Sequence, residues 1–127
     1  MNTVDATAPY DDDNIFAKIL RGEASCDKVY EDEWALAFHD IAPAADTHVL
    51  VVPKGRYVAW DDFSRNAEAE EIAGFVRAVG KVARDLGLVE PGHRMICNTG
   101  AHGGQMVPHL HVHLLGGRFI GPMAAPG

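Results

Sequence analysis

Residues 108–118 read PHLHVHLLGGR, a stretch that predicts a β-strand and a functional site at once. Histidines alternate in it with apolar residues, in the order His109, Leu110, His111, Val112, His113 and Leu114. A period of two is typical of a strand, because successive side chains point to opposite faces of a sheet. We therefore expect the apolar face to meet the core and the three imidazoles to meet solvent or a ligand. Since imidazole gains and loses a proton near neutral pH, this face suits acid–base, nucleophilic or metal chemistry.

The composition indicates one globular domain and argues against several kinds of partner. Of the 127 residues, 47% are hydrophobic and 23% are charged, and the formal net charge is -7. Nucleic-acid binders carry a basic patch, so no nucleic-acid partner is expected, although a local site can hold a single nucleotide. The first residues, MNTVDATAPYDDDN, lack the basic start and apolar run of a signal peptide, and no stretch has the length of a membrane span. We expect a cytoplasmic protein with no membrane partner.

The rest of the chain predicts an α+β fold with a mainly antiparallel sheet. Residues 1–13 are expected to form a flexible acidic tail, and residues 14–127 a single small domain. Asp13 or Asn14 can cap a short N-terminal helix that carries Ile15, Phe16, Ile19 and Leu20. Apolar runs bounded by turn residues predict strands at 28–31, 34–40, 48–52 and 93–98.

One long helix is expected between the last two of these strands. Apolar residues recur there at three- and four-residue spacing from Ile72 to Leu86, which is typical of an amphipathic helix. Ser64 or Asn66 is expected to cap this helix, and Gly87 to end it. The glycine-rich segment 100–104 then predicts a loop that leads into the histidine strand.

Zinc is one candidate ligand for the three histidines, because imidazole nitrogens bind it at roughly 2 Å. Residues two apart on a flat strand lie roughly 6–7 Å from each other, so three of them do not converge on one ion without help from the rest of the fold. The chain has no Cys-x-x-Cys or His-Glu-x-x-His pattern, and its two cysteines, Cys26 and Cys97, lie far apart. We therefore expect no metal at these histidines.

Nucleophilic chemistry is the second candidate for the histidine strand. A neutral imidazole nitrogen can attack an activated phosphorus and form a covalent adduct, which water then hydrolyses. The neighbouring histidines and the backbone amides of residues 103–105 can supply hydrogen bonds to the phosphate oxygens. A glycine-rich segment alone indicates only a turn, but beside three histidines it favours a phosphate site.

The histidine stretch resembles the signature of the histidine triad family, in which three histidines alternate with apolar residues. NIFAKILRGE, VYEDEWALAFHDIAPAADTHVLVVPK and GGQMVPHLHVHLLGGR all look like its nucleoside-phosphoramidase branch, and the likeness extends from about Asn14 to Pro122. The resemblance implies a small α+β domain that forms a two-fold homodimer. It also implies hydrolysis of purine nucleoside 5′-phosphoramidates without a metal or organic cofactor. The alternatives are dinucleoside-polyphosphate or adenylyl-sulfate hydrolysis, and a regulatory or scaffolding nucleotide-binding dimer.

The resemblance implies a role for each site residue as well. His111 would attack the α-phosphorus, and His113 would bond a phosphate oxygen. His109 and His48 would form a supporting hydrogen-bond network, and Asp40 would hold the ribose hydroxyls. The base would lie among Ile15, Phe16, Ile19, Phe38, His39 and Ile41, and the phosphate near Asn98, Gly104 and Gln105. Met106 would be a further substrate-binding residue. Without the resemblance, the apolar members are explained as well by core packing, and His48 by a structural role.

Two places depart from the family pattern. Met106 follows Gln105 where relatives often carry Ser, Thr or another polar residue, and a thioether cannot donate a proton to a departing amine. We therefore expect weaker activation of the leaving group, or a proton supplied by His109 or by water. Asn14 and Ala17 stand where some bacterial relatives carry zinc-binding cysteines, and neither residue replaces a thiolate.

Overall fold

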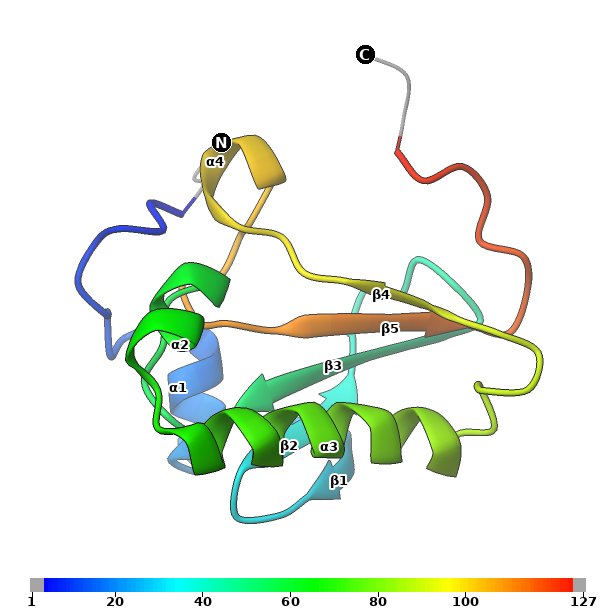
Figure 1. The fold of residues 1–127 in the computed structure, drawn as a ribbon, viewed down its shortest axis with the longest axis horizontal. Helices are drawn as coiled ribbons and strands as arrows, with labels where there is room; N and C mark the ends of the chain where they lie inside the picture. The colour runs from blue at the N-terminus through cyan, green and yellow to red at the C-terminus, as the bar shows by residue number, and fades with distance from the viewer. Residues whose placement is uncertain (1–3, 125–127) are drawn as a thin grey trace.

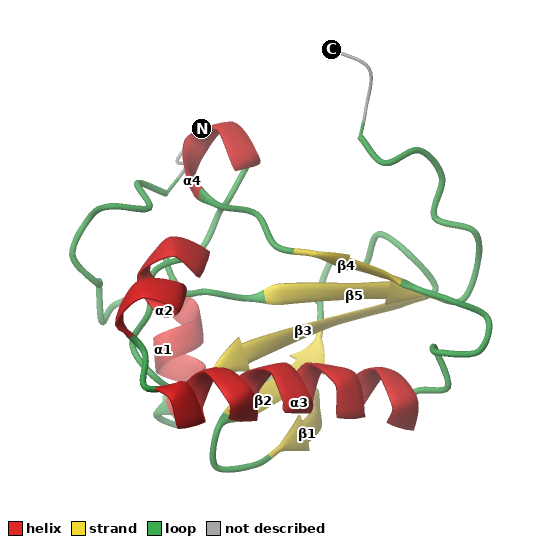
Figure 2. Ribbon diagram, in the orientation of Figure 1, coloured by secondary structure: helices red, strands yellow, loops and turns green. Residues whose placement is uncertain are grey.

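A five-stranded antiparallel sheet forms the centre of the protein (Figure 2). In the computed structural model, which describes residues 4–124, the strand order is β1-β2-β3-β5-β4, and each neighbouring pair is antiparallel. The strands are β1 (Lys28–Glu31), β2 (Ala35–His39), β3 (Thr47–Pro53), β4 (Arg94–Ile96) and β5 (Val112–Gly116). The predicted α+β fold is confirmed, and the predicted strands agree with the observed ones to within a few residues except in the histidine segment.

Helices cover both faces of this sheet unequally. They are α1 (Ile15–Leu20), α2 (Trp60–Asn66), α3 (Ala69–Asp85) and α4 (Gly100–Gly103). The long helix α3 runs across one face of the sheet, while α1 lies behind the sheet in the view of Figure 1. Within residues 4–124, none of the helices has both the length and the apolar character needed to cross a bilayer.

The sequence predicted N-terminal caps for two helices, and only the cap of the first helix is confirmed. Asn14 caps α1 as expected, because its side-chain Oδ1 accepts a hydrogen bond from the Ala17 amide at 2.9 Å. The predicted caps of the long helix, Ser64 and Asn66, are wrong, since both lie inside the separate helix α2. Ala67 is extended and ends α2, so α3 begins only after Glu68.

Apolar residues on the two faces of the sheet form two separate cores. On the α3 face, sheet residues such as Val49, Val51 and Val112 pack with Phe75 and the buried stripe of the helix. On the α1 face, Phe16 packs with a smaller set of sheet residues, which comprises Leu36, Phe38, Leu50 and Val52. Because this second core covers only part of its face, the rest of the sheet surface remains available for a site.

The histidine segment differs from its prediction at its start. The alternation is as expected, since Leu110, Val112 and Leu114 are buried in the α3-face core. Strand β5, however, begins only at Val112, because the Leu110 amide donates its hydrogen bond to the Tyr57 carbonyl in a loop instead of to a neighbouring strand. The expectation of three imidazoles facing solvent or a ligand is wrong for His109, which is fully buried.

The segment 4–13 lies against the domain, although the sequence suggests a flexible tail. Val4 is buried beside Val58, and its amide donates to the Gln105 carbonyl at 3.1 Å. Asp12 forms a two-point ion pair with Arg56, and the segment passes beside α4 in Figure 1. Residues 1–3 of the predicted tail and 125–127 of the predicted domain lie outside the described residues, and the division at residue 13 stays a prediction.

Candidate functional site

A cavity of about 460 Å³ opens on the α1 face of the sheet. Twelve of the predicted site residues line it: Ile15, Phe16, Ile19, Phe38, His39, Asp40, Ile41, Asn98, Gly104, Met106, His111 and His113. His48, Gln105 and His109 do not line the cavity and lie behind it, each of them buried. The sequence therefore indicated most of the wall, while the structure separates residues that face the cavity from residues that hold them.

His111 presents an unprotonated nitrogen to the cavity. Its Nδ1 lies 2.7 Å from the backbone carbonyl oxygen of His109. A carbonyl can only accept, so Nδ1 must carry the proton and donate it. In the neutral imidazole the other nitrogen, Nε2, then keeps its electron pair, and His111 lines the cavity. The geometry thus equips this side chain to act as a nucleophile or a base.

His113 presents a protonated nitrogen to the cavity, in contrast to His111, because a second chain of hydrogen bonds fixes the position of its proton. The Ala44 amide donates to His48 Nδ1 at 2.9 Å, so the proton of neutral His48 is on Nε2. His48 Nε2 lies 2.9 Å from His113 Nδ1 and donates to it. Neutral His113 therefore carries its own proton on Nε2, where it can be donated to a ligand in the cavity. Two neighbouring rings, with centroids 5.1 Å apart, offer an electron pair and a proton respectively.

Among the described residues, one cluster of side chains has a spacing that would suit a metal ion. The same hydrogen bonds oppose metal binding there. Asp40, His48 and His113 each offer a ligand atom, and these atoms lie within 4.8 Å of one another. A metal on His48 Nε2 would require the proton to move to Nδ1, which faces the Ala44 N–H. Two N–H groups would then point at each other, so these residues fit a hydrogen-bond network better than a metal site.

Burial lowers the pKa of each of the three alternating histidines. It lowers the pKa of His109 from 6.5 to about 4, with the nearby His111 acting in the same direction. Burial, together with His111 and His48, lowers the pKa of His113 to about 4. Burial also lowers the pKa of His111. All three rings are thus uncharged at neutral pH, which is the state that the hydrogen bonds above require.

Acid should therefore destabilise the protein below about pH 6.5, the unfolded pKa of histidine. The neutral, buried His109 contributes stability that is fully present above that pH. The contribution is lost as the pH falls toward 4, because His109 binds a proton in the unfolded chain at a higher pH than it does in the folded one. The difference between the two pKa values corresponds to about 3 kcal/mol of unfolding free energy.

Urea unfolding at several pH values checks this expectation, with His109→Gln compared with wild type. The variant should lose less stability than wild type between neutral and acid pH, because it lacks the titrating group. His102→Gln is the matched control, since it makes the same substitution at an exposed position. Equal pH slopes for wild type and His109→Gln would contradict the prediction.

The glycine-rich segment 100–104 differs from its prediction as a loop, because its first four residues are helical. Residues 100–103 form the short helix α4, and Gly104 follows with a φ of 76°, a left-handed conformation that favours glycine. Gly104 lines the cavity near Asn98, whereas Gln105 turns inward. The Gln105 side chain accepts from the Gly100 amide at 2.9 Å and donates to the Val58 and Val107 carbonyls at 2.7 and 3.0 Å. Gln105 therefore shapes the loop from behind.

The apolar part of the cavity is built on α1 and β2. Phe16 contacts Phe38 edge to face, with ring centroids 5.4 Å apart, and contacts the His111 ring in the same manner at 5.0 Å. Ile41 is fully exposed and Ile15 is 46% exposed, so both lie at the rim. Asp40 lies beside His48, with 3.4 Å between its Oδ2 and His48 Nε2. A planar apolar group and a polar group with hydroxyls would both find suitable partners here.

Five lining residues were not anticipated from the sequence: Ser25, Cys26, Asp27, Leu50 and Val107. Leu50 could have been predicted from strand periodicity, because it stands two residues after His48 on a strand and thus shares its face. Residues 25–27 lie in the connection between α1 and β1, where no periodicity predicts which side chains face the cavity. A second hollow of about 510 Å³ between residues 91–94 and 117–120 holds no comparable histidine pair.

The fold and the site together define a small α+β domain built around a cluster of histidines. Residues 21–120 match the HIT domain, named for the histidine triad, and the chain belongs to this family. The names of its relatives identify it as a hydrolase. The chain is 45% identical over 115 residues to the purine nucleoside phosphoramidase of Escherichia coli (strain K12), which covers 90% of this chain and 95% of that protein.

Two further relatives agree with this placement. An uncharacterized HIT-like protein of Azospirillum brasilense is 58% identical over 118 residues, or 93% of this chain and 97% of that protein. A solved HIT family hydrolase from Legionella pneumophila superposes with a TM-score of 0.76 at 42% identity, covering 83% of this chain and 93% of that one.

Proposed function

We propose that this hydrolase cleaves the P–N bond of purine nucleoside 5′-phosphoramidates and releases the nucleoside monophosphate. The observation that carries the proposal is the complementary pair in the cavity, in which His111 offers an electron pair and His113 a proton. Attack on phosphorus needs both, a nucleophile and a donor for the charge that develops on the phosphate oxygens. The phosphoramidase name of the Escherichia coli relative supports the same reaction.

The proposed reaction has two steps. His111 Nε2 attacks the α-phosphorus and the P–N bond to the amine breaks, while a water molecule gives the departing amine its proton and becomes hydroxide. The hydroxide then attacks the nucleotidyl-histidine, the bond from phosphorus to Nε2 breaks, and the nucleoside monophosphate is released. One water is consumed, and His111 returns to its neutral form. The hydrogen bond from Nδ1 to the His109 carbonyl supports the partial positive charge that His111 gains in the first step.

The other roles follow from the positions of the cavity residues. We propose that Asp40 binds the ribose hydroxyls and that the purine lies against Phe16 and Phe38. Asn98 and Gly104 would lie beside the phosphate, with the loop supported by Gln105. An apolar pocket accepts adenine and guanine alike. We place the protein in the cytoplasm, where purine nucleotides are its substrates and no nucleic acid or membrane is its partner.

A substrate panel tests this proposal against its alternatives. Adenosine 5′-phosphoramidate, a diadenosine polyphosphate and adenylyl sulfate would be compared at equal concentration, with release of AMP as the common readout. Fastest turnover of the phosphoramidate is the expected result. Faster turnover of either other substrate would replace the proposed reaction with that hydrolysis. Tight nucleotide binding with no turnover of any substrate would favour a regulatory or scaffolding role.

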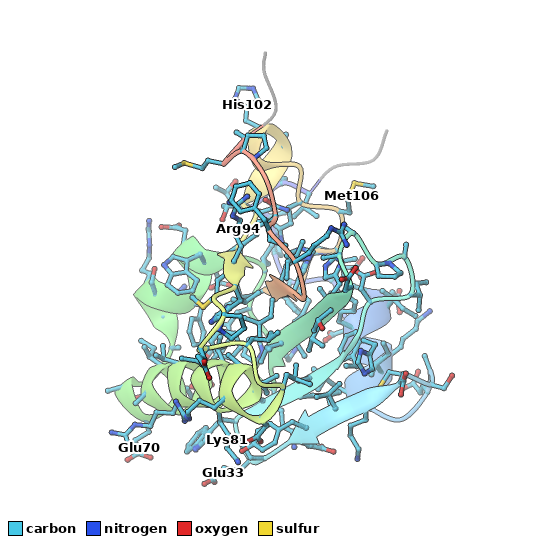
Figure 3. All side chains as sticks on the ribbon, turned by 90° about the vertical axis from the view of Figure 1, so that its right-hand side faces the viewer. Glu33, Glu70, Lys81, Arg94, His102 and Met106 are labelled. Atoms are coloured by element: carbon cyan, nitrogen blue, oxygen red, sulfur yellow. The ribbon has the colours of Figure 1, made fainter. Side chains whose placement is uncertain are left out.

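Met106 should limit the rate at which the amine leaves. It lines the cavity, is 60% exposed, and projects outward in Figure 3. Its thioether has no proton to donate to a leaving group. Met106→Ser supplies a hydroxyl, so we expect kcat for the phosphoramidate to rise by about two- to tenfold. Met106→Ala is the matched control, because it shortens the side chain without adding a donor. An equal rise in both variants, or none in Met106→Ser, would contradict the prediction.

We propose that the protein forms a homodimer through the edge strand β4. This strand pairs with β5 on one side, and its other edge is unpaired among the described residues. An apolar hollow with the exposed side chains of Trp60 and Met95 adjoins it. Analytical ultracentrifugation should find twice the chain mass of 13.7 kDa, and Met95→Lys should shift the protein toward the monomer. A wild-type protein of monomer mass would refute the dimer.

A further inference from the structure

A phenol from the N-terminal segment reaches the buried side of the histidine cluster. The Tyr10 hydroxyl lies 2.6 Å from His109 Nδ1, although 99 positions separate the two residues in the chain. The rings meet edge to face with centroids 5.6 Å apart. Tyr10 does not line the cavity, so its hydroxyl cannot act on a substrate directly. Its contact with His109 is part of no role assigned so far.

The direction of this hydrogen bond follows from the second nitrogen of the ring. His109 Nε2 lies 2.8 Å from the Pro53 carbonyl, which only accepts, so Nε2 carries the proton. Nδ1 of the neutral ring must then accept, and the Tyr10 hydroxyl is the donor. Burial raises the pKa of Tyr10, so the phenol keeps its proton. Two partners thus fix both the tautomer and the orientation of a fully buried imidazole.

His109 in turn controls His111 through its own backbone. The carbonyl oxygen of His109 accepts the Nδ1–H of His111 at 2.7 Å, which leaves the electron pair of His111 on Nε2. A ring anchored on both nitrogens restrains the residue to which that carbonyl belongs. Without the Tyr10 hydroxyl, Nδ1 of His109 would be a buried acceptor without a donor, a costly state that favours rearrangement of the residue.

The segment that carries Tyr10 is itself held in place. The guanidinium of Arg56 lies over the Tyr10 ring, 5.1 Å from its centroid, and pairs with Asp12 at 2.8 and 2.9 Å. The Val4 amide bonds the Gln105 carbonyl on the other side of Tyr10 in the sequence. Contacts on both sides of Tyr10 therefore keep its hydroxyl at His109, which a mobile terminus would not do.

We propose that Tyr10 is a positioning residue for the reaction proposed above: it anchors His109, whose carbonyl holds the His111 Nδ1–H and so keeps Nε2 directed at phosphorus. The proposal rests on the proposed function only for its effect on rate. The tautomer of His111 is a property of the protein alone, and it can be measured without any substrate. Tyr10→Phe removes the hydroxyl and preserves the ring.

Nitrogen-15 NMR of histidine-labelled protein, together with steady-state kinetics on adenosine 5′-phosphoramidate, tests the proposal. In wild type, His111 should be protonated on Nδ1 alone. In Tyr10→Phe it should show a mixture of tautomers, kcat should fall about five- to tenfold, and KM should change by less than about twofold. The matched control is Tyr57→Phe, which removes a phenol hydroxyl bonded to Glu71 on the α3 side. This control should change neither the tautomer nor kcat.

An unchanged His111 tautomer in Tyr10→Phe overturns the proposal, as does a changed tautomer with unchanged kcat. The same changes in Tyr57→Phe also overturn it, because they would reflect general loosening of the fold. If wild type hydrolyses no phosphoramidate, the proposed function fails separately. The tautomer comparison still decides whether Tyr10 positions His111.

Discussion

Replacing His111 with alanine is expected to lower kcat for adenosine 5′-phosphoramidate by about 10⁵-fold, the scale seen when an enzyme loses its nucleophile. The imidazole contributes the only unprotonated ring nitrogen that the described hydrogen bonds direct at the cavity. His113 cannot replace it, because its Nδ1 accepts the proton of His48 and its Nε2 carries a proton. The loss should therefore appear in kcat, while nucleotide binding by the remaining wall changes little.

Rapid-quench mass spectrometry of the intact protein provides the direct measurement. Wild type mixed with the phosphoramidate should gain the mass of one nucleotidyl group before steady state, and His111→Ala should gain none. His102→Ala is the matched control, since His102 is exposed, does not line the cavity, and stands at the tip of the molecule in Figure 3. A fully active His111→Ala, or an adduct that survives the substitution, would refute the role of His111.

Short-range periods predicted most elements of the fold, whereas the role of His111 as the nucleophile came from the family resemblance and stays a prediction. A period of two assigned the buried face of the histidine segment, and that assignment holds for Leu110, Val112 and Leu114. The sequence places the start of the long helix too early. Two residues with good capping side chains, Ser64 and Asn66, belong instead to α2, which has no clear periodic pattern.

The protonation pattern of the site was not predictable from the sequence. It depends on hydrogen bonds that the Ala44 amide and the Tyr10 hydroxyl donate and that the Pro53 carbonyl accepts, and none of these groups lies near the triad in the chain. The family resemblance put His109 and His48 in one supporting network. In the structure, His48 Nε2 donates to His113 Nδ1, and the His109 carbonyl accepts the Nδ1–H of His111.

Gln105, which the family resemblance places near the phosphate, supports the loop with its side chain. Its side chain is 1% exposed and joins three backbone groups from different places: the Gly100 amide at the start of α4, the Val58 carbonyl before α2, and the Val107 carbonyl next to the triad. Its own carbonyl accepts from the Val4 amide. The side chain thus connects α4, the segment before α2 and the histidine segment, and the backbone of the same residue connects the N-terminal segment.

Gln105→Leu should therefore lower the free energy of unfolding by about 3–5 kcal/mol. Leucine has a similar volume, but it leaves one donor and two acceptors without partners, and each unsatisfied buried group costs about 1–3 kcal/mol. Urea unfolding at neutral pH measures the loss. Asn66→Leu is the matched control, because its amide donates to Asp62 at an exposed position and its loss should cost less than about 0.5 kcal/mol.

The same substitution should also show whether the Gln105 side chain supports the loop from behind or contacts the phosphate directly. If Gln105 acts from behind the loop, Gln105→Leu releases Gly104 and weakens nucleotide binding together with stability. A stabilising osmolyte that restores the folded population should then restore part of the binding. If the side chain instead touched the phosphate, stability would stay near wild type while KM rose. Since all three bonds of the side chain are made to backbone groups, we expect the first result, and unchanged stability would refute it.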